Sequence, residues 1–245
     1  MRPTWTRRLM CGRLQRLQVS AGTFGDHLQI SPAATRMRPR RPVAPPQKPI
    51  GEVRIIGGQL KRSKLGVIDR PGLRPTPDRV RETLFNWLGP GIVGLRVLDL
   101  CAGTGVLGFE ALSRGAAAVH FNEPDRELAA RIAADAERLK VADRITLTRE
   151  PAQALLSRPP AARYDGAFVD PPYALDLWPA LLDGLPGWLR DGAFVYLEHP
   201  RERSLDLDPA RWQPRRSAQA GQIAYHLLDY AEASASVVGS EGTSS

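Results

Sequence analysis

The chain has 245 residues, of which 42% are hydrophobic and 24% are charged, and its formal net charge is +8. This composition is typical of a globular protein and excludes a fibrous or low-complexity chain. No apolar run approaches the roughly 18 residues that a membrane helix needs, so we expect no membrane span. The cysteine usage described below makes the cytoplasm the expected compartment.

The positive charge is concentrated near the N-terminus. Residues 1–50 hold ten Lys or Arg and a single acid, Asp26, whereas the other 195 residues together carry a net charge of −1. An Arg- and Pro-rich segment without periodicity predicts a disordered basic arm, and a targeting segment or a start codon placed upstream of Met37 remains an alternative. The small polar residues 231–245 predict a flexible tail.

Cysteine and histidine spacing gives no sign of a disulfide or a metal site. Two cysteines far apart indicate a reducing compartment, and the four histidines have no ligand spacing. These residues are Cys11, Cys101, His27, His120, His199 and His226.

Residues 51–90 predict a basic hairpin followed by an amphipathic helix. Two strand-like runs flank Gly57-Gly58, a dipeptide that suits a two-residue turn. In the helix, Thr76 is the expected N-cap and apolar residues repeat with helical spacing from Val80 to Leu88. The other face of this helix presents Arg79, for which solvation is the simplest explanation from the sequence alone. The hairpin carries Arg54, Lys61, Arg62 and Lys64.

From residue 95 onwards, apolar strands alternate with helices. Such alternation predicts an α/β fold with a mostly parallel sheet covered by helices on both faces, and ligands bind at the carboxyl ends of its strands. We expect strands at 95–100, 117–123, 144–148, 165–170 and 192–199, helices at 106–115, 124–140 and 175–189, and a strand at 222–230 that pairs antiparallel at one edge.

A glycine motif, Gly103-x-Gly105-x-x-Gly108, follows the first of these strands and opens a helix, as in nucleotide-binding folds. Glu123 ends the next strand, where a carboxylate can accept both hydroxyls of a ribose. Asp99, four residues before the first glycine, would repel a pyrophosphate but suits a cationic ligand. S-adenosylmethionine is such a ligand, and residues 95–228 resemble the Rossmann-like methyltransferases.

The strand at 165–170 ends in Asp170-Pro171-Pro172-Tyr173. Prolines stop the strand ladder and leave their carbonyls free. If Asp170 and the Pro171 carbonyl each accept one N–H of an exocyclic amine, the nitrogen can offer its lone pair to a methyl group. Tyr173 can stack on a base that has left its own stack.

This motif resembles the (Asp/Asn)-Pro-Pro-(Tyr/Phe) motif of amino-methyltransferases. Together with "RIIGGQLKRSKL", "RPTPDRVRETLFNWL", "VLDLCAGTGVLGFEALSRGA" and "NEPDR", it makes residues 54–198 resemble the bacterial 16S rRNA guanine-N2 methyltransferases that modify guanine 966.

That resemblance implies a class I methyltransferase with a seven-stranded sheet, and a monomer that acts on 16S rRNA or the assembling small subunit. It implies RNA contacts by the hairpin residues, Arg74 and Arg79, and cofactor contacts by Asp99, Ala102, Gly103, Gly105, Glu123 and Glu150. At Glu150 and Pro151, the chain has Glu-Pro where the family has Asp or Asn followed by Ala.

The expected organisation is an arm at 1–50, an RNA-contacting module at 51–90, a methyltransferase domain at 91–230 and a tail at 231–245. Three alternatives stay open. A DNA adenine-N6 methyltransferase shares the Asp-Pro-Pro-Tyr motif, but normally needs a recognition insert that this chain lacks. An NAD-dependent oxidoreductase shares the glycine motif, and a non-catalytic RNA-binding protein would explain only the basic arm.

Overall fold

The computed structural model describes residues 49–70 and 76–232. Most of the expected arm, the tail from residue 233, Cys11, His27 and Arg74 lie outside these residues. In the described part, no helix is both long enough and apolar enough to cross a membrane.

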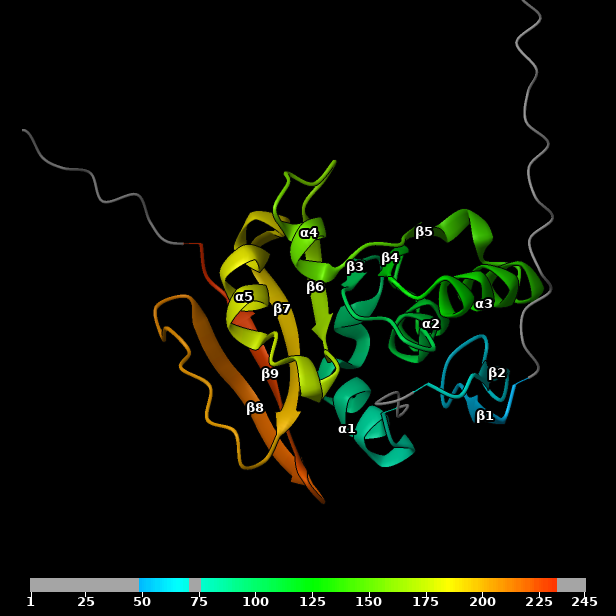
Figure 1. The fold of residues 1–245 in the computed structure, drawn as a ribbon, viewed down its shortest axis with the longest axis horizontal. Helices are drawn as coiled ribbons and strands as arrows, with labels where there is room; N and C mark the ends of the chain where they lie inside the picture. Colours follow the sequence, from blue (N-terminus) through cyan, green and yellow to red (C-terminus); the bar gives the residue numbers. More distant parts are fainter. Residues whose placement is uncertain (1–48, 71–75, 233–245) are drawn as a thin grey trace, which may run out of the picture. The chain divides into compact units, whose positions relative to one another are not determined.

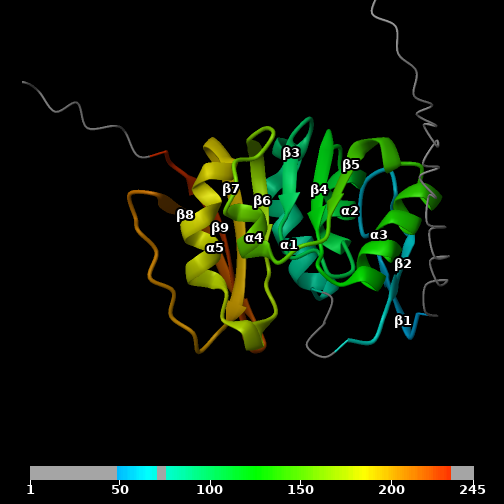
Figure 2. The ribbon, with the colours of Figure 1, turned by 45° about the horizontal axis from the view of Figure 1, so that its top comes forward.

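The central element is a seven-stranded sheet with the strand order β5-β4-β3-β6-β7-β9-β8 (Figures 1 and 2). The first five strands in this order are parallel, β9 pairs antiparallel with β7, and β8 pairs antiparallel with β9. The predicted Rossmann-like fold is therefore confirmed. The strands span β3 Arg96–Asp99, β4 Ala118–Asn122, β5 Ile145–Thr148, β6 Tyr164–Val169, β7 Leu189–Pro200, β8 Trp212–Ala220 and β9 Ile223–Tyr230.

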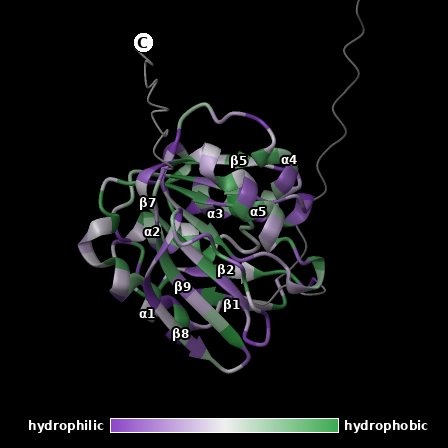
Figure 3. Cartoon of the chain, turned by 90° about the vertical axis from the view of Figure 1, so that its left-hand side faces the viewer, coloured by the Kyte–Doolittle hydropathy of each residue, from purple (hydrophilic) through white to green (hydrophobic). Residues whose placement is uncertain are grey.

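Helices cover both faces of the sheet, and each face has its own core. Val97 of β3 and Phe168 of β6 point into one core, whereas their neighbours Leu98 and Val169 point into the other, as the two-residue period of a strand requires. Helices α1, α2 and α3 pack on the first core, and α4 and α5 on the second. Hydrophobic residues, green in Figure 3, accordingly follow the strands. The helices span α1 Asp78–Leu88, α2 Val106–Ser113, α3 Arg126–Arg138, α4 Ala152–Leu156 and α5 Trp178–Gly184, with short 3-10 turns η1 Gly89–Ile92, η2 Ala142–Arg144, η3 Tyr173–Leu175 and η4 Leu185–Trp188.

The N-terminal hairpin consists of β1 Gly51–Arg54 and β2 Lys64–Val67, which pair antiparallel. The prediction of a two-residue turn at Gly57-Gly58 is wrong, because residues 55–63 form a longer connection that rests on the end of α2. Gly58 has a φ of 74°, and a Cβ atom there would lie 1.9 Å from the carbonyl oxygen of Ser113. Glycine is needed at this position for close approach to α2 rather than for a tight turn.

The start of α1 also differs from the prediction. Pro77 occupies the N-cap position, and the Thr76 hydroxyl points to Asp170 instead of capping the helix. Arg81 is fully buried, and its guanidinium donates to the carbonyl oxygens of Thr76 at 3.0 Å and Arg54 at 2.9 Å. This arginine therefore joins the hairpin to the beginning of α1.

Candidate functional site

Three acidic residues follow or end neighbouring parallel strands. Asp99 is the last residue of β3 and lies in register with Phe121 of β4 and Phe168 of β6. Glu123 directly follows β4, and Asp170 directly follows β6. The structure thus brings the two predicted halves of the site, the glycine motif and Asp-Pro-Pro-Tyr, to one edge of the sheet.

The glycine loop follows β3 and is held by Glu123. Gly103 and Gly105 have φ values of 54° and 74°, which glycine adopts without strain. One carboxylate oxygen of Glu123 accepts the Gly103 N–H at 2.8 Å, and the other accepts the Asp125 N–H at 2.8 Å. The Ala102 N–H donates to Asn122 at 3.0 Å, which ties the loop to the end of β4.

Gly108, the third glycine of the motif, has a packing role. A Cβ atom at this position would lie 2.2 Å from the Phe121 ring, so its absence lets α2 approach β4 closely. Its N–H donates to the Asp99 carboxylate at 3.0 Å. The motif therefore places the first turn of α2 directly against the acidic end of β3.

The edge is strongly acidic and desolvated. Burial, with a smaller contribution from the Glu123 charge, raises the pKa of Asp99 to about 7. Burial also raises the pKa of Glu123, although its two N–H partners oppose this shift. The pKa of Cys101 is raised by burial and by Asp170, Asp99 and Glu123, so this thiol lies among all three acids. Asp99 and Glu123 form no ion pair with any residue that the structure describes, and buried carboxylates of this kind fit a positively charged ligand, such as the sulfonium and amine of S-adenosylmethionine.

Asp170 is linked to both the N-terminal module and β7. Its carboxylate accepts the Thr76 hydroxyl at 3.3 Å. Burial raises the pKa of Asp170 well above its usual range, and the charge of Glu198 adds to this effect. Pro171 is buried, whereas Pro172 and Tyr173 are exposed, the latter by 38%. The aromatic ring is therefore open to a base from solution.

Glu198, in β7, is a site residue that the sequence reasoning missed. Its buried carboxylate accepts the hydroxyls of Tyr173 at 2.7 Å and Tyr196 at 2.6 Å. Its backbone oxygen accepts the indole N–H of Trp178 at 2.7 Å, and the Tyr173 and Trp178 rings are 5.8 Å apart. An acid directly after the apolar run at 193–197, in the strand next to β6, is the signal that could have identified it.

Glu150 has other partners in the structure. It follows β5, its carboxylate forms an ion pair with Arg158, and its backbone oxygen accepts the Asn122 side-chain N–H at 3.1 Å. Arg158 binds one of the two carboxylate oxygens, so the expected contact with a cofactor adenine stays a prediction for the other.

The predicted RNA-contacting residues are mostly exposed. Lys64 pairs with Glu52 at 2.7 Å across the hairpin. The other described members form no ion pair with a described residue, so their charge is available to a polyanion. They are Arg54, Lys61, Arg62 and Arg79.

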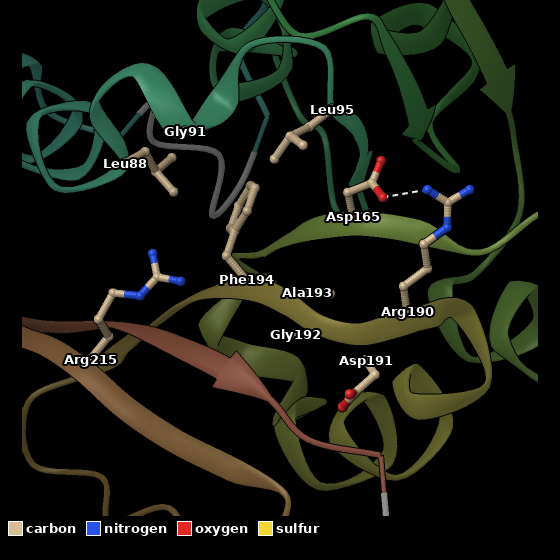
Figure 4. A pocket seen from close by; sticks show the side chains of 10 residues that line it. All are labelled: Leu88, Gly91, Leu95, Asp165, Arg190, Asp191, Gly192, Ala193, Phe194 and Arg215. Atoms are coloured by element: carbon tan, nitrogen blue, oxygen red, sulfur yellow. Dashed lines mark hydrogen bonds and ion pairs between the residues drawn. The ribbon is translucent and has the colours of Figure 1, made fainter.

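A pocket of about 330 Å³ lies away from this site (Figure 4). Its lining includes Leu95, Asp165 and Arg190, which stand at the beginnings of β3, β6 and β7, the opposite end of the sheet from Asp99. Asp165 and Arg190 form an ion pair there. Within residues 49–70 and 76–232, no group of three or more potential metal-ligating side chains occurs.

Comparisons with known proteins agree with this geometry. A family model described as "Conserved hypothetical protein 95" matches residues 53–229. Ribosomal RNA small subunit methyltransferase D of Escherichia coli K12 is 44% identical over 179 residues, which cover 72% of this chain and 89% of that protein. The Haemophilus influenzae protein of the same name is 38% identical over 181 residues, 72% and 93% of the two chains. The structure of the putative methyltransferase yhhF from E. coli matches with a TM-score of 0.68 at 40% identity, over 74% of this chain and 99% of that chain.

Proposed function

Because the chain belongs to the family of ribosomal RNA small subunit methyltransferase D, we propose that it methylates the exocyclic N2 amine of a guanine in 16S rRNA. Family membership makes the chain an S-adenosylmethionine-dependent rRNA methyltransferase. The proposal concerns the modified base, the atom that receives the methyl group and the roles of individual residues.

The observation that carries the proposal is the placement of Asp170-Pro171-Pro172-Tyr173 at the end of β6, beside the glycine loop of β3. An amine held by the first group would lie next to a methyl donor held by the second. Neither a dehydrogenase nor a passive RNA-binding protein needs a motif that grips an amino group at this edge.

S-adenosylmethionine, when bound, supplies an electrophilic methyl group on a sulfonium. Asp99, Glu123 and the loop residues Ala102, Gly103 and Gly105 would hold it. The Glu123 oxygens each accept one backbone N–H and retain a lone pair for ribose hydroxyls. The buried Asp99 would ionise against the positive charge.

Asp170 and the Pro171 carbonyl would each accept one N–H of the guanine amine, which turns the nitrogen lone pair toward the methyl group. The rigid corner made by Pro171 and Pro172 fixes the direction of both acceptors. A raised pKa suits Asp170 to take the proton that the methylated amine loses. Tyr173, held by Glu198, would stack on the base.

The exposed cations of the hairpin and α1 would contact phosphates and give affinity without reading sequence. We further propose that the protein works in the cytoplasm as a monomer, on 16S rRNA or the assembling small subunit.

The test combines labelled S-adenosylmethionine with small subunits, naked 16S rRNA and DNA, followed by nucleoside analysis. We expect N2-methylguanosine from the ribosomal substrates. Asp170→Ala should abolish transfer and still bind the methyl donor in calorimetry. Methylated adenine in DNA, or unchanged turnover of Asp170→Ala, would contradict the proposal.

A further inference from the structure

Two of the four large apolar side chains that are exposed in the described residues lie in one short turn. Tyr173 is 38% exposed and Leu175 is 60% exposed, and both belong to η3, directly after the two prolines. A single exposed leucine is ordinary on a protein surface. An exposed leucine two residues from a ring that would stack on a target base has a more specific use.

The turn is clamped at both ends. The Tyr173 hydroxyl donates to Glu198 at 2.7 Å at its beginning. At its end, the Asp176 carboxylate pairs with Arg203 at 2.6 Å, and the Arg203 guanidinium lies over the Trp178 ring at 5.0 Å.

The backbone of the turn is also defined. The Leu175 N–H donates to the Pro172 oxygen at 3.1 Å, and Asp176 adopts the left-handed conformation with a φ of 46°. Aspartate tolerates this conformation better than most residues. Leu175 is therefore an apolar side chain carried to the surface on a fixed support.

A base that reacts at its amino group must leave its stack, and this unstacking costs a few kcal/mol. Proteins that open stacked nucleic acid commonly insert an apolar side chain such as Leu into the gap. On the proposed function, the target guanine rests against Tyr173, so the gap that it leaves in the RNA would face the same turn.

Resting on the proposed function, we infer that Leu175 is an RNA-binding residue that fills the place vacated by the target guanine. It contacts the bases on either side of the gap and slows return of the guanine to the stack. Tyr173 stacks on the extruded base, and Leu175 occupies the gap between the two flanking bases.

The experiment uses Leu175→Ala with Val93→Ala as the matched control, because Val93 is 61% exposed and lies outside the site. A small-subunit RNA fragment carries 2-aminopurine, which fluoresces when it loses its stacking partner, next to the target guanine. With S-adenosylhomocysteine present, wild type and Val93→Ala should raise the fluorescence upon binding. Leu175→Ala should give less than half of that rise, and Leu175→Phe should restore it.

Methylation gives a second readout. On a fragment with a stacked target guanine, Leu175→Ala should lower kcat/KM about tenfold relative to wild type. On a fragment whose target guanine is already unstacked, kcat/KM should stay within about twofold of the wild-type value. Equal behaviour of Leu175→Ala and Val93→Ala in both assays would overturn the inference. If the wild-type protein raises the fluorescence but forms no N2-methylguanosine, the proposed function fails while the inference about Leu175 stands.

Discussion

Thr76 donates its hydroxyl to the Asp170 carboxylate across 3.3 Å, so a residue that precedes α1 touches the acid that follows β6. The carbonyl of the same threonine accepts from Arg81, which also binds the Arg54 carbonyl. The basic hairpin and the proposed catalytic carboxylate are therefore joined through two residues.

Replacing Thr76 by Val should shift the pH dependence of methyl transfer upward. The hydroxyl lowers the pKa of Asp170, so its loss should raise that pKa further. The amine is held by ionised Asp170, so activity at pH 7 should fall and recover at higher pH. Single-turnover rates from pH 6 to 10 measure this, and Thr76→Ser should resemble wild type.

Binding of S-adenosylmethionine should strengthen with pH through the titration of Asp99. Its pKa is about 7 because the carboxylate is buried, and only the ionised form attracts the cationic ligand. The affinity should rise up to about tenfold per unit below pH 7 and level off above it. Calorimetry measures this, and Asp99→Asn should bind weakly with a flat profile. A steep profile in that variant would assign the titration to another group.

Removing Glu198 should disorder Tyr173. Glu198→Ala leaves two phenol hydroxyls without their acceptor, and we expect methyl transfer to fall about 10- to 100-fold at saturating methyl donor. Tyr196→Phe is the control, because it keeps the bond between Tyr173 and Glu198 and should cost less than about fivefold. A similar loss in both variants would indicate a general packing defect instead.

Gly58→Ala should destabilise the protein more than Gly94→Ala. Both glycines have positive φ, 74° and 77°, and both replacements incur the same backbone strain of about 1 kcal/mol. Only at Gly58 does the added Cβ meet a backbone atom, the Ser113 oxygen, whereas nothing lies within 4 Å at Gly94. We expect at least about 2 kcal/mol of additional loss in the free energy of unfolding, measured by urea denaturation.

The alternation of strands and helices after residue 95 could be predicted from the sequence, because apolar runs bounded by turn residues are compatible with few other folds. Residues 222–230 were recognised as a strand but assigned to an edge, because β8 was missed. The segment of β8 is rich in polar residues and has no regular alternation, since most of its side chains are exposed. Amphipathic periodicity cannot identify such a strand.

Within the site, Asp99, Glu123 and Asp170 could be placed from the sequence because each ends or follows a strand at the ligand-binding edge. The roles of Thr76 and Arg81 could not, since they depend on contacts between segments far apart in the chain. The Glu150 ion pair with Arg158 likewise depends on how the chain folds on either side of α4 and has no local signal.

Arg81 and Glu110 are both fully buried and lie 3.6 Å apart, and Glu110 also accepts the N–H groups of Ile56 and Gly57. Deleting the hairpin and α1 would remove Arg81 and both N–H donors, and would leave Arg114 as the one remaining described partner of the Glu110 carboxylate. Loss of these buried partners should destabilise the protein. A chimera that exchanges RNA specificity between two members of this family must therefore transplant α2 together with the hairpin. Such an exchange of specificity would therefore involve a helix whose residues are all buried in this structure.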